Sequence, residues 1–444
     1  MKTQGTAKPQ APSRSRPKTA GPTLSAEQAL AKITPARRAA FEILTLVGEN
    51  KGHSDELLHS PITESLSSED RNLATALVMG VLRWQIALDA RIHTLLQRPG
   101  QRLAEPVALT LRLGAFQLLH MDRIPPHAAL SESVELCRAA GEPHATGMVN
   151  AILRKIATSQ KPGTRVFEST AAFAQRLAHP RWLVERWVAH YGRDAALAIC
   201  EADQHEPQAT SIFNEVGGDL PIMDNGSRLV AELAAAAMPA AKKIWDCCAA
   251  PGGKTLILAH RAPHAEMHAT DVSAKRTAQM QARFKRFAYA ERILCSVVDA
   301  STPAPHEEKF DLILCDVPCS GTGTLAANPE IRHRLKPEEL ARQAERQRAI
   351  LNGALKRLVP GGRLIYSTCS LESEENEEVI AAVSTPGIRK LPIDKLMQSL
   401  RISGILREET LLDSAIHDGV LRTLPGVHPC DGFFAAVFER TTEV

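Results

Sequence analysis

From residue 242 to the C-terminus, short apolar runs of strand length alternate with longer runs of helical periodicity. This alternation constrains the fold strongly, because strands joined by helices form a parallel sheet that is covered by helices on both faces. We therefore predict an α/β domain in this part of the chain. The expected strands cover residues 244–247, 265–270, 293–298, 310–314 and 363–367, with two further candidates at 419–422 and 433–438, and the expected helices cover residues 255–262, 275–288, 338–358 and 375–383.

A glycine-rich stretch, residues 246–254, separates the first expected strand from the first helix. Its Pro-Gly-Gly sequence lets the backbone turn sharply and approach a ligand closely, and the helix that follows begins with unpaired N–H groups. The stretch matches neither the Walker phosphate loop nor the Gly-x-Gly-x-x-Gly dinucleotide turn. Taken alone, such a sequence is more often a simple turn than a binding site.

Acidic residues follow the next two expected strands. Asp271 comes 18 residues after Gly253, close to where a dinucleotide-binding fold places an acid on a ribose hydroxyl. Asp299 follows the third strand, where it can face an adenine edge. A single acid at such a place is more often a helix cap, but a glycine-rich turn and two acids in this order favour an adenosine-containing ligand. Without a phosphate-cradling loop, S-adenosylmethionine is favoured over a nucleotide or NAD.

Two cysteines follow the fourth and fifth expected strands. Cys319 lies in the sequence Asp-Val-Pro-Cys that begins at Asp316, and Cys369 lies 50 residues later in Ser-Thr-Cys-Ser. Ligands of open α/β sheets bind at the carboxyl ends of the strands, so we expect both thiols at one site. A cysteine is commonly no more than a small buried apolar residue. The cysteines expected to be of that kind are Cys247, Cys295 and Cys315.

The N-terminal part of the chain has a different pattern. From residue 34 to about residue 158, apolar residues recur at helix-face spacing, which predicts an all-α domain of five to seven helices. The preceding residues are basic and rich in Pro, Ser, Thr and Ala, a composition typical of disorder. Ser227 is expected to cap a helix that runs to about residue 238. The predicted domains are a disordered basic tail over 1–30, a helical domain over 31–158, a helical linker over 159–235 and the α/β domain over 236–444.

The composition is that of an ordinary globular protein, with 44% hydrophobic and 23% charged residues. We expect no membrane span, because no apolar run approaches about 18 residues, and no secretory signal. The nine cysteines lack Cys-x-x-Cys spacing, which indicates reduced thiols in a cytoplasmic protein without a metal site. The formal net charge of +3 is too small to indicate a nucleic-acid partner without local basic patches.

Four ordered elements carry a family resemblance. Residues 246–254, the Asp-x-Pro-Cys element at 316–319, the Thr-Cys-Ser element at 368–370 and Asp-Gly-Phe-Phe at 431–434 resemble the Sun/Fmu family of RNA 5-methylcytosine methyltransferases. The N-terminal helices are similar to the NusB-like RNA-binding domain that precedes the catalytic domain in this family. The resemblance implies an all-α NusB-like domain followed by an α/β Rossmann-like S-adenosylmethionine-dependent methyltransferase domain. It also implies a monomer that acts on RNA, with 16S ribosomal RNA expected first and transfer RNA as the alternative.

The resemblance also assigns roles to residues. Cytosine carbon 5 becomes nucleophilic only after a thiolate adds at carbon 6, and a free cysteine is mostly protonated at neutral pH. By resemblance, Cys369 is that nucleophile, Asp316 meets the ring nitrogen 3 edge, and Cys319 assists the elimination that releases the methylated base. The expected cofactor contacts are Cys248, Ala249, Ala250, Pro251, Gly252, Gly253, Lys254, Asp271, Asp299 and Asp316.

Basic residues near these elements suggest an RNA-backbone surface, although scattered solvated charge explains them equally well from spacing alone. Those in the α/β domain are Arg276, Arg283, Lys285, Arg286, Arg332, Arg334 and Lys336, and those in the helical domain are Arg37, Arg38, Arg83, Arg112, Arg154 and Lys155.

The sequence departs from the family before the α/β domain, in the part that faces RNA. Only about a dozen residues separate Asn214 from the helix at Ser227, where members usually carry a longer insert that builds a small RNA-facing subdomain, so the linker is a reduced version of it. Arg332-His333 stands where the family commonly has Lys-Trp. These departures put the identity of the target cytosine in doubt more than the reaction.

Two other functions compete with cytosine methylation. A non-catalytic RNA-binding assembly factor could keep the same fold, although the intact Cys319, Cys369 and Asp316 argue against it. An amino-methyltransferase typically has an Asn/Asp-Pro-Pro-aromatic element, and here a thiol stands where the aromatic ring would stack. Covalent trapping by 5-fluorocytosine or 5-azacytosine RNA would distinguish the first hypothesis from both.

Overall fold

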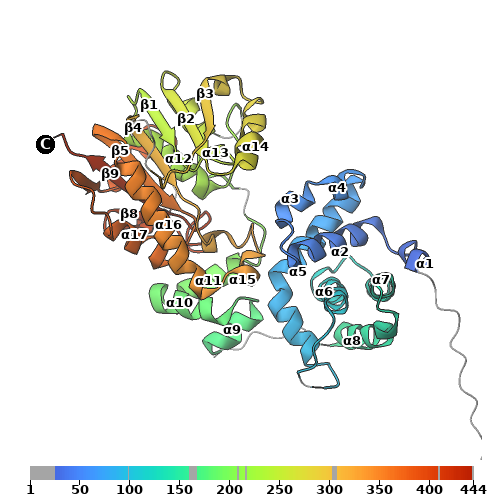
Figure 1. Cartoon of the computed structure of the whole chain (residues 1–444). Coiled ribbons are helices and arrows are strands. Elements are labelled where there is room, and N and C mark those ends of the chain that lie inside the picture. The colour runs from blue at the N-terminus through green and yellow to red at the C-terminus, as the bar shows by residue number, and fades with distance from the viewer. Residues whose placement is uncertain are drawn as a thin grey trace, which may run out of the picture.

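The computed structural model describes residues 26–98, 100–159, 168–207, 210–215, 218–302, 308–408 and 411–442. A helical domain and a sheet domain lie side by side, and the linker helices lie against the sheet domain (Figure 1). The predicted fold class is therefore confirmed. The disorder predicted for the basic tail falls largely outside the described residues. The boundary at residue 30 is wrong, however, because α1 (Ala26–Leu30) occupies the last five residues of that predicted tail and packs against the helical domain, with Ala29 fully buried.

The helical domain is built around α5, its longest helix, which packs between α2 and α6. Ser67 caps α5 by accepting a hydrogen bond from the N–H of Asp70 at 3.1 Å, as expected for a serine at this position. A proline opens α2, α4, α6 and α7, where its missing N–H has no helical partner to lose. The helices are α2 (Pro35–Gly48), α3 (Ser54–Leu58), α4 (Pro61–Glu64), α5 (Ser68–His93), α6 (Glu105–His120), α7 (Pro126–Ala139) and α8 (Thr146–Thr158).

Among the described residues, α5 is the one helix long and apolar enough in composition to cross a membrane. In the fold, its apolar residues form the core of the helical domain, where Leu77, Val78 and Val81 are buried. The apolar character of α5 is thus accounted for by packing within the domain.

The first three linker helices pack on loops of the sheet domain, and the fourth packs on the sheet itself. Phe173 and Trp187 of the linker share an apolar cluster with Leu325 and Leu371 of the sheet domain. The cap of the last linker helix is Asp224 and not Ser227 as expected, because the Asp224 carboxylate accepts the Ser227 N–H at 2.8 Å. The linker helices are α9 (Thr170–Arg176), α10 (Arg181–Tyr191), α11 (Arg193–Ala202) and α12 (Asn225–Ala237).

The sheet has nine strands, and its main order is β3-β2-β1-β4-β5-β9-β8-β7, with β6 paired to β9. The first five strands of this order are parallel, as predicted, but β9 runs antiparallel to β5, so the sheet is mixed and not wholly parallel. Two short strands, β6 and β7, were not expected. The strands are β1 (Lys243–Asp246), β2 (Glu266–Asp271), β3 (Ile293–Val297), β4 (Phe310–Asp316), β5 (Leu358–Thr368), β6 (Ile388–Leu391), β7 (Ile416–His417), β8 (Val420–Arg422) and β9 (Phe434–Arg440).

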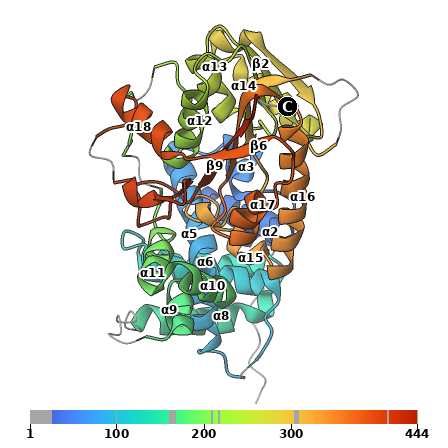
Figure 2. The same ribbon diagram turned by 90° about the vertical axis from the view of Figure 1, so that its left-hand side faces the viewer.

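Helices cover both faces of the sheet (Figure 2). One face packs on α12, α13, α14 and α18, and the other on α16 and α17. The central strands β1, β4 and β9 are buried on both sides, which explains why their sequences are nearly continuous apolar runs, whereas the edge strand β3 is largely exposed. These helices are α13 (Gly253–Arg261), α14 (Ala274–Phe284), α16 (Pro337–Leu355), α17 (Glu377–Ala381) and α18 (Asp394–Ile402).

The short helix α15 (Ile331–Arg334) joins the two domains. The Arg332 guanidinium, 2% exposed, donates to the carbonyl of Arg83 in α5 at 3.0 Å and to that of Ala178 in the linker at 3.2 Å. Glu330, just before α15, accepts the Ser54 N–H at 3.1 Å and the Ser54 hydroxyl at 2.9 Å. The segment that carries α15 therefore fixes the helical domain and the linker to the sheet domain.

Candidate active site

The two sequence-predicted thiols meet at the carboxyl end of the sheet. Cys319 follows β4 and Cys369 follows β5, and these strands are parallel neighbours with Asp316 in register with Ser367. The sulfur atoms lie 3.3 Å apart, and both cysteines are free and half-buried. The hydrogen bond with Cys369, together with burial, raises the pKa of Cys319 well above its ordinary value. The raised pKa favours the protonated form of Cys319, whose thiol can then donate to the Cys369 sulfur.

Two glycines bring the C-terminal segment against the thiol loops. A side chain on Gly323 would place its Cβ 2.3 Å from the carbonyl oxygen of Gly432, so only glycine fits there. The Gly432 N–H donates to the Gly323 carbonyl at 2.8 Å, and the Gly323 N–H donates to the Cys369 carbonyl at 2.9 Å. This close approach explains why Asp-Gly-Phe-Phe, far along the sequence, belongs to the same site.

An ion pair lies between the thiols and the glycine-rich turn. Lys254 Nζ is 2.7 Å from Asp316 Oδ2, and Asp316 Oδ1 accepts the Ser367 hydroxyl at 2.7 Å. The ammonium also lies 5.3 Å from the centre of the Phe433 ring. Burial alone would lower the pKa of Lys254, but the attraction of Asp316 outweighs it and raises the pKa. Lys254 is thus a charged donor held between the thiols and the glycine-rich turn.

The glycine-rich turn lines a cavity of about 240 Å³. Gly252 adopts a φ of +92°, and a Cβ there would lie 2.5 Å from Phe284 of α14, so the turn needs glycine for its conformation and its packing. Asp246 lines the cavity, and within the described residues its buried Oδ1 has no hydrogen-bond partner, so this carboxyl offers an acceptor to a ligand. Burial raises the pKa of Asp246 to about 7. The lining residues are Ile222, Met223, Asp224, Ser227, Asp246, Cys248, Ala249, Ala250, Pro251, Gly253, Lys254, Arg283 and Asp316.

The two acids predicted to contact an adenosine lie at the ends of their strands but do not line this cavity. Asp271 ends β2 and is 3% exposed, and its carboxylate accepts the Ser273 N–H at 2.9 Å and pairs with Arg276 at 3.1 Å. Asp299 follows β3, is exposed, and bonds to Ser301, which lowers its pKa. Their assignment as cofactor contacts stays a prediction.

Known proteins resemble this chain over most of its length. Residues 235–439 match the family model of the 16S rRNA methyltransferase RsmB/F, and residues 34–158 match that of the NusB family. A Bacillus subtilis protein named probable ribosomal RNA small subunit methyltransferase B is 30% identical over 463 residues, which cover 91% of this chain and 98% of the relative. The chain belongs to the RsmB/F methyltransferase family.

Two further comparisons agree with the RsmB/F assignment. The ribosomal RNA small subunit methyltransferase B of Citrobacter koseri is 30% identical over 428 residues, which cover 87% of this chain and 94% of the relative. The crystal structure of PH0851 has a TM-score of 0.70 at 22% identity and covers 92% of this chain and 99% of that one, which shows a shared fold. The helical domain is thus a NusB domain, and the chain is an RNA methyltransferase.

Enzymes of the RsmB/F family use S-adenosylmethionine. The cavity at the glycine-rich turn fits such a cofactor, because it joins an apolar wall at Ala249 and Ala250 to an unpartnered acceptor on Asp246. The residues that would hold the cofactor are the lining residues of the predicted turn together with Asp246, Met223 and Arg283. The sequence did not assign these last three to the cofactor: Asp246 was named only as the first residue of the glycine-rich stretch, Arg283 only as a candidate for RNA-backbone contact, and Met223 was given no role.

The predicted basic surface divides into two parts. Arg332 and Arg334 are not available to RNA phosphates, because they donate to backbone carbonyls at the domain interface, Arg334 to Val47 and Gly52 at 2.8 Å each. In the NusB domain, Arg37 pairs with Glu132 at 2.9 Å and Arg112 with Asp89 at 2.7 Å. Arg83 donates to the Ala326 carbonyl at 2.8 Å. Exposed basic residues of the predicted set remain in both domains, and the densest group lies on and just after α14, where Lys275, not named from the sequence, adds to Arg276, Lys285 and Arg286. The other exposed members of the set are Arg38, Arg154, Lys155 and Lys336.

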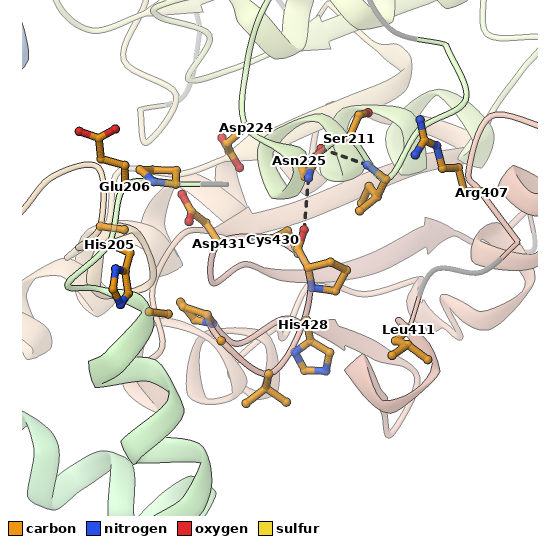
Figure 3. Close-up of a pocket in the computed structure, with 18 residues that line it drawn as sticks. His205, Glu206, Ser211, Asp224, Asn225, Arg407, Leu411, His428, Cys430 and Asp431 are labelled. Atoms are coloured by element: carbon orange, nitrogen blue, oxygen red, sulfur yellow. Dashed lines mark hydrogen bonds between the residues drawn. The ribbon is translucent and has the colours of Figure 1, made fainter. Parts of the chain in front are cut away.

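A larger cavity of about 560 Å³ adjoins the first, and Asp224 lines both. It lies between the linker and the loop at residues 425–431, and it is not lined by the two thiols. Figure 3 shows the carboxyl groups of Asp224 and Asp431 on one side of it, and Asn225 bridges its wall by donating to the Pro429 carbonyl at 3.2 Å. Burial raises the pKa of Asp431 to about 7.

Proposed function

We propose that this RsmB/F methyltransferase transfers a methyl group to carbon 5 of a cytosine in small-subunit ribosomal RNA, through a covalent adduct with Cys369. The observation that carries the proposal is the 3.3 Å separation of the Cys319 and Cys369 sulfur atoms beside the Lys254–Asp316 pair. Methylation of an exocyclic nitrogen or of a protein has no use for two adjacent thiols. The names of the curated relatives support ribosomal RNA as the substrate.

Cys369 acts first, by forming a bond between its sulfur and carbon 6 of the cytosine. The thiolate needed for this attack is stabilised by the Cys319 thiol, which donates to it, and the Lys254 ammonium provides further positive charge. The electron pair of the carbon 5–carbon 6 double bond moves toward carbon 5 and the ring. S-adenosylmethionine, when bound, supplies an electrophilic methyl group for that carbon.

The Asp316–Lys254 pair holds the ring edge during the addition. Asp316 accepts the Ser367 hydroxyl and pairs with Lys254, and its remaining lone pairs can accept a hydrogen bond from the exocyclic amine of cytosine. Lys254 can donate to ring nitrogen 3, where negative charge develops as carbon 6 is attacked. The expected role of Asp316 is thus shared with Lys254.

Cys319 acts last. When a solvent water takes the proton from carbon 5, the electron pair of that carbon–hydrogen bond restores the carbon 5–carbon 6 double bond. The bond between carbon 6 and the Cys369 sulfur breaks, and the sulfur leaves as a thiolate. The Cys319 thiol, which keeps its proton, donates to the departing sulfur and so favours release. Without this donor the adduct is expected to persist.

RNA binding is assigned to the NusB domain and to the exposed basic residues of α14. Between residues 274 and 290 the chain carries five basic residues and no acidic ones, and α14 borders the cofactor cavity through Arg283. Extruding a base from a helix costs a few kcal/mol, so a single-stranded or loop cytosine is the cheapest substrate.

The covalent mechanism is tested with 5-fluorocytosine RNA, which should stay attached to the wild-type protein. Cys369→Ala should lose both methylation and trapping, whereas Cys319→Ala should accumulate a stalled adduct with ordinary RNA. Turnover by Cys369→Ala would contradict its role as the nucleophile, and no adduct with Cys319→Ala would remove the role in release. Bisulfite sequencing of ribosomal and transfer RNA, from cells with and without the protein, identifies the target, and no change in either would favour the non-catalytic assembly factor.

A further inference from the structure

A single buried carboxylate lies behind the two thiols. Glu375, at the end of a short 3₁₀ turn (Ser373–Glu375) after β5, is fully buried. Within the described part of the chain no Lys, Arg or His side chain forms an ion pair with it. Four neutral donors solvate it instead. Oε1 accepts the Ser320 N–H at 2.8 Å and the Gln347 amide at 2.9 Å, and Oε2 accepts the hydroxyls of Ser320 and Ser370.

The partners of Glu375 are the residues that follow each thiol. Ser320 comes directly after Cys319, and Ser370 comes directly after Cys369. Their hydroxyl oxygens lie 3.0 Å apart, and both bond to the same carboxylate oxygen. One residue thus ties together two loops that are 50 residues apart in the sequence.

The fold anchors this carboxylate firmly. Tyr366, a buried residue of β5, donates its hydroxyl to the Glu375 carbonyl at 2.6 Å. The next residue, Asn376, donates to the Ser370 carbonyl at 2.8 Å and accepts the Thr368 hydroxyl at 2.5 Å. Hydrogen bonds hold both the backbone and the side chain of Glu375, so its position sets the positions of the loops that carry Ser320 and Ser370.

We propose that Glu375 is a positioning residue, which fixes the distance between the Cys319 and Cys369 thiols by bonding to the serine after each cysteine. The inference rests on the proposed covalent function, since that function gives the distance its purpose. The negative charge of Glu375 adds to this role, because it also raises the pKa of Cys319. The hydrogen bond with Cys369, burial and the charge of Cys369 raise that pKa more strongly. Glu375 thereby favours the protonated Cys319 that release requires.

The thiol–disulfide equilibrium with glutathione tests the positioning without RNA or cofactor. Two protein thiols and one oxidised glutathione give a Cys319–Cys369 disulfide and two reduced glutathiones, and the equilibrium constant measures the effective concentration of one thiol at the other. Mass spectrometry of digested protein identifies the linked peptides. In Glu375→Ala the effective concentration should fall about 100-fold, as expected for a displacement near 1 Å.

Two further variants separate geometry from charge and guard against a folding defect. Glu375→Gln keeps an acceptor and an amide that the serine hydroxyls can accept, so its effective concentration should stay within about threefold of wild type. Ser320→Ala combined with Ser370→Ala removes the two hydroxyl links but not the acid, and should lower the effective concentration about tenfold. If Glu375→Ala does not fold, this double variant decides.

Glu330 provides the matched control. It is also buried and also accepts a serine N–H and hydroxyl, those of Ser54, but it lies at the domain interface. Glu330→Ala should lose stability while its thiol–disulfide equilibrium stays within about twofold of wild type. The proposal is overturned if Glu375→Ala and the double serine variant keep the wild-type equilibrium, or if Glu330→Ala shifts it equally.

Trapping by 5-fluorocytosine RNA then connects the positioning to the reaction. With the Glu375 variants, the rate of trapping should fall in proportion to the effective concentration, while the dissociation constant for S-adenosylmethionine stays unchanged. If wild-type protein traps no RNA, the covalent function fails, and the glutathione equilibrium still decides whether Glu375 positions the thiols. A trapping rate that is unchanged in Glu375→Ala, despite a shifted equilibrium, would overturn the link to catalysis.

Discussion

The helices α14 and α15 carry the same kind of charge and use it in opposite ways. From the sequence, their basic residues form one expected RNA-binding surface. In the structure, Lys275, Lys285 and Arg286 at α14 are exposed, whereas Arg332 in α15 is 2% exposed and donates to backbone carbonyls of three parts of the chain. Residue type predicts charge, but only the fold decides whether that charge meets solvent or the interior.

The strongest test of this difference is Arg332→Ala. Hydrogen bonds to a charged group contribute about 1.5–3 kcal/mol each, and the buried carbonyls of Arg83, Ala178 and Asp203 would lose their donor. We expect the free energy of unfolding to fall by about 3 kcal/mol, measured by urea denaturation. Arg342→Ala, whose side chain is 74% exposed, should change it by less than about 0.5 kcal/mol. Equal effects of the two variants would mean that α15 does not join the domains.

The opposite result is expected at α14. Reversing two charges, with Lys285→Glu and Arg286→Glu, should leave unfolding unchanged and weaken binding to a small-subunit ribosomal RNA fragment about tenfold. The slope of log affinity against log salt should decrease by about 2, because two phosphate contacts are lost. Fluorescence anisotropy at several salt concentrations measures both. Lys390→Glu with Lys395→Glu, two exposed charges beyond the other edge of the sheet, is the matched control and should bind as wild type.

A smaller effect is expected from pH at the α15 interface. His333 bonds to the Leu82 carbonyl at 2.7 Å, and burial lowers its pKa from 6.5 to about 4. Below pH 6.5 His333 therefore binds a proton in the unfolded chain but not in the folded chain. The contribution of neutral His333 to the free energy of unfolding is complete above pH 6.5 and is lost as pH falls toward 4. Between pH 7 and pH 5 the His333 contribution to the free energy of unfolding should fall by about 2 kcal/mol. Unfolding of His333→Gln at both pH values should show a loss smaller by that amount, and an identical loss would refute the assignment.

The sequence predicted what depends on local pattern. The five parallel strands were found because each is a short apolar run and helical patterns follow all of them except β3. The meeting of Cys319 with Cys369 follows from their places after neighbouring strands. The strand β9 was expected, but its antiparallel direction was not. That direction depends on how the chain returns to the sheet between β5 and β9, which no short sequence pattern indicates. Arg332 was misassigned because its acceptors are backbone carbonyls, which every residue possesses. Glu375 was missed for a related reason, since its partners are serines up to 55 residues away.

The path from Cys319 to Arg334 spans only 16 residues, yet one end bears a thiol of the candidate site and the other binds the helical domain. In an isolated fragment beginning at residue 236, Arg332 would lose its carbonyl acceptors in α5 and the linker. Its guanidinium would then lie beside apolar residues with fewer hydrogen bonds. Such a fragment should represent the intact enzyme poorly, because the segment 319–334 would lose hydrogen bonds that fix its conformation. Biochemical dissection of this chain is therefore better done by point substitution than by truncation.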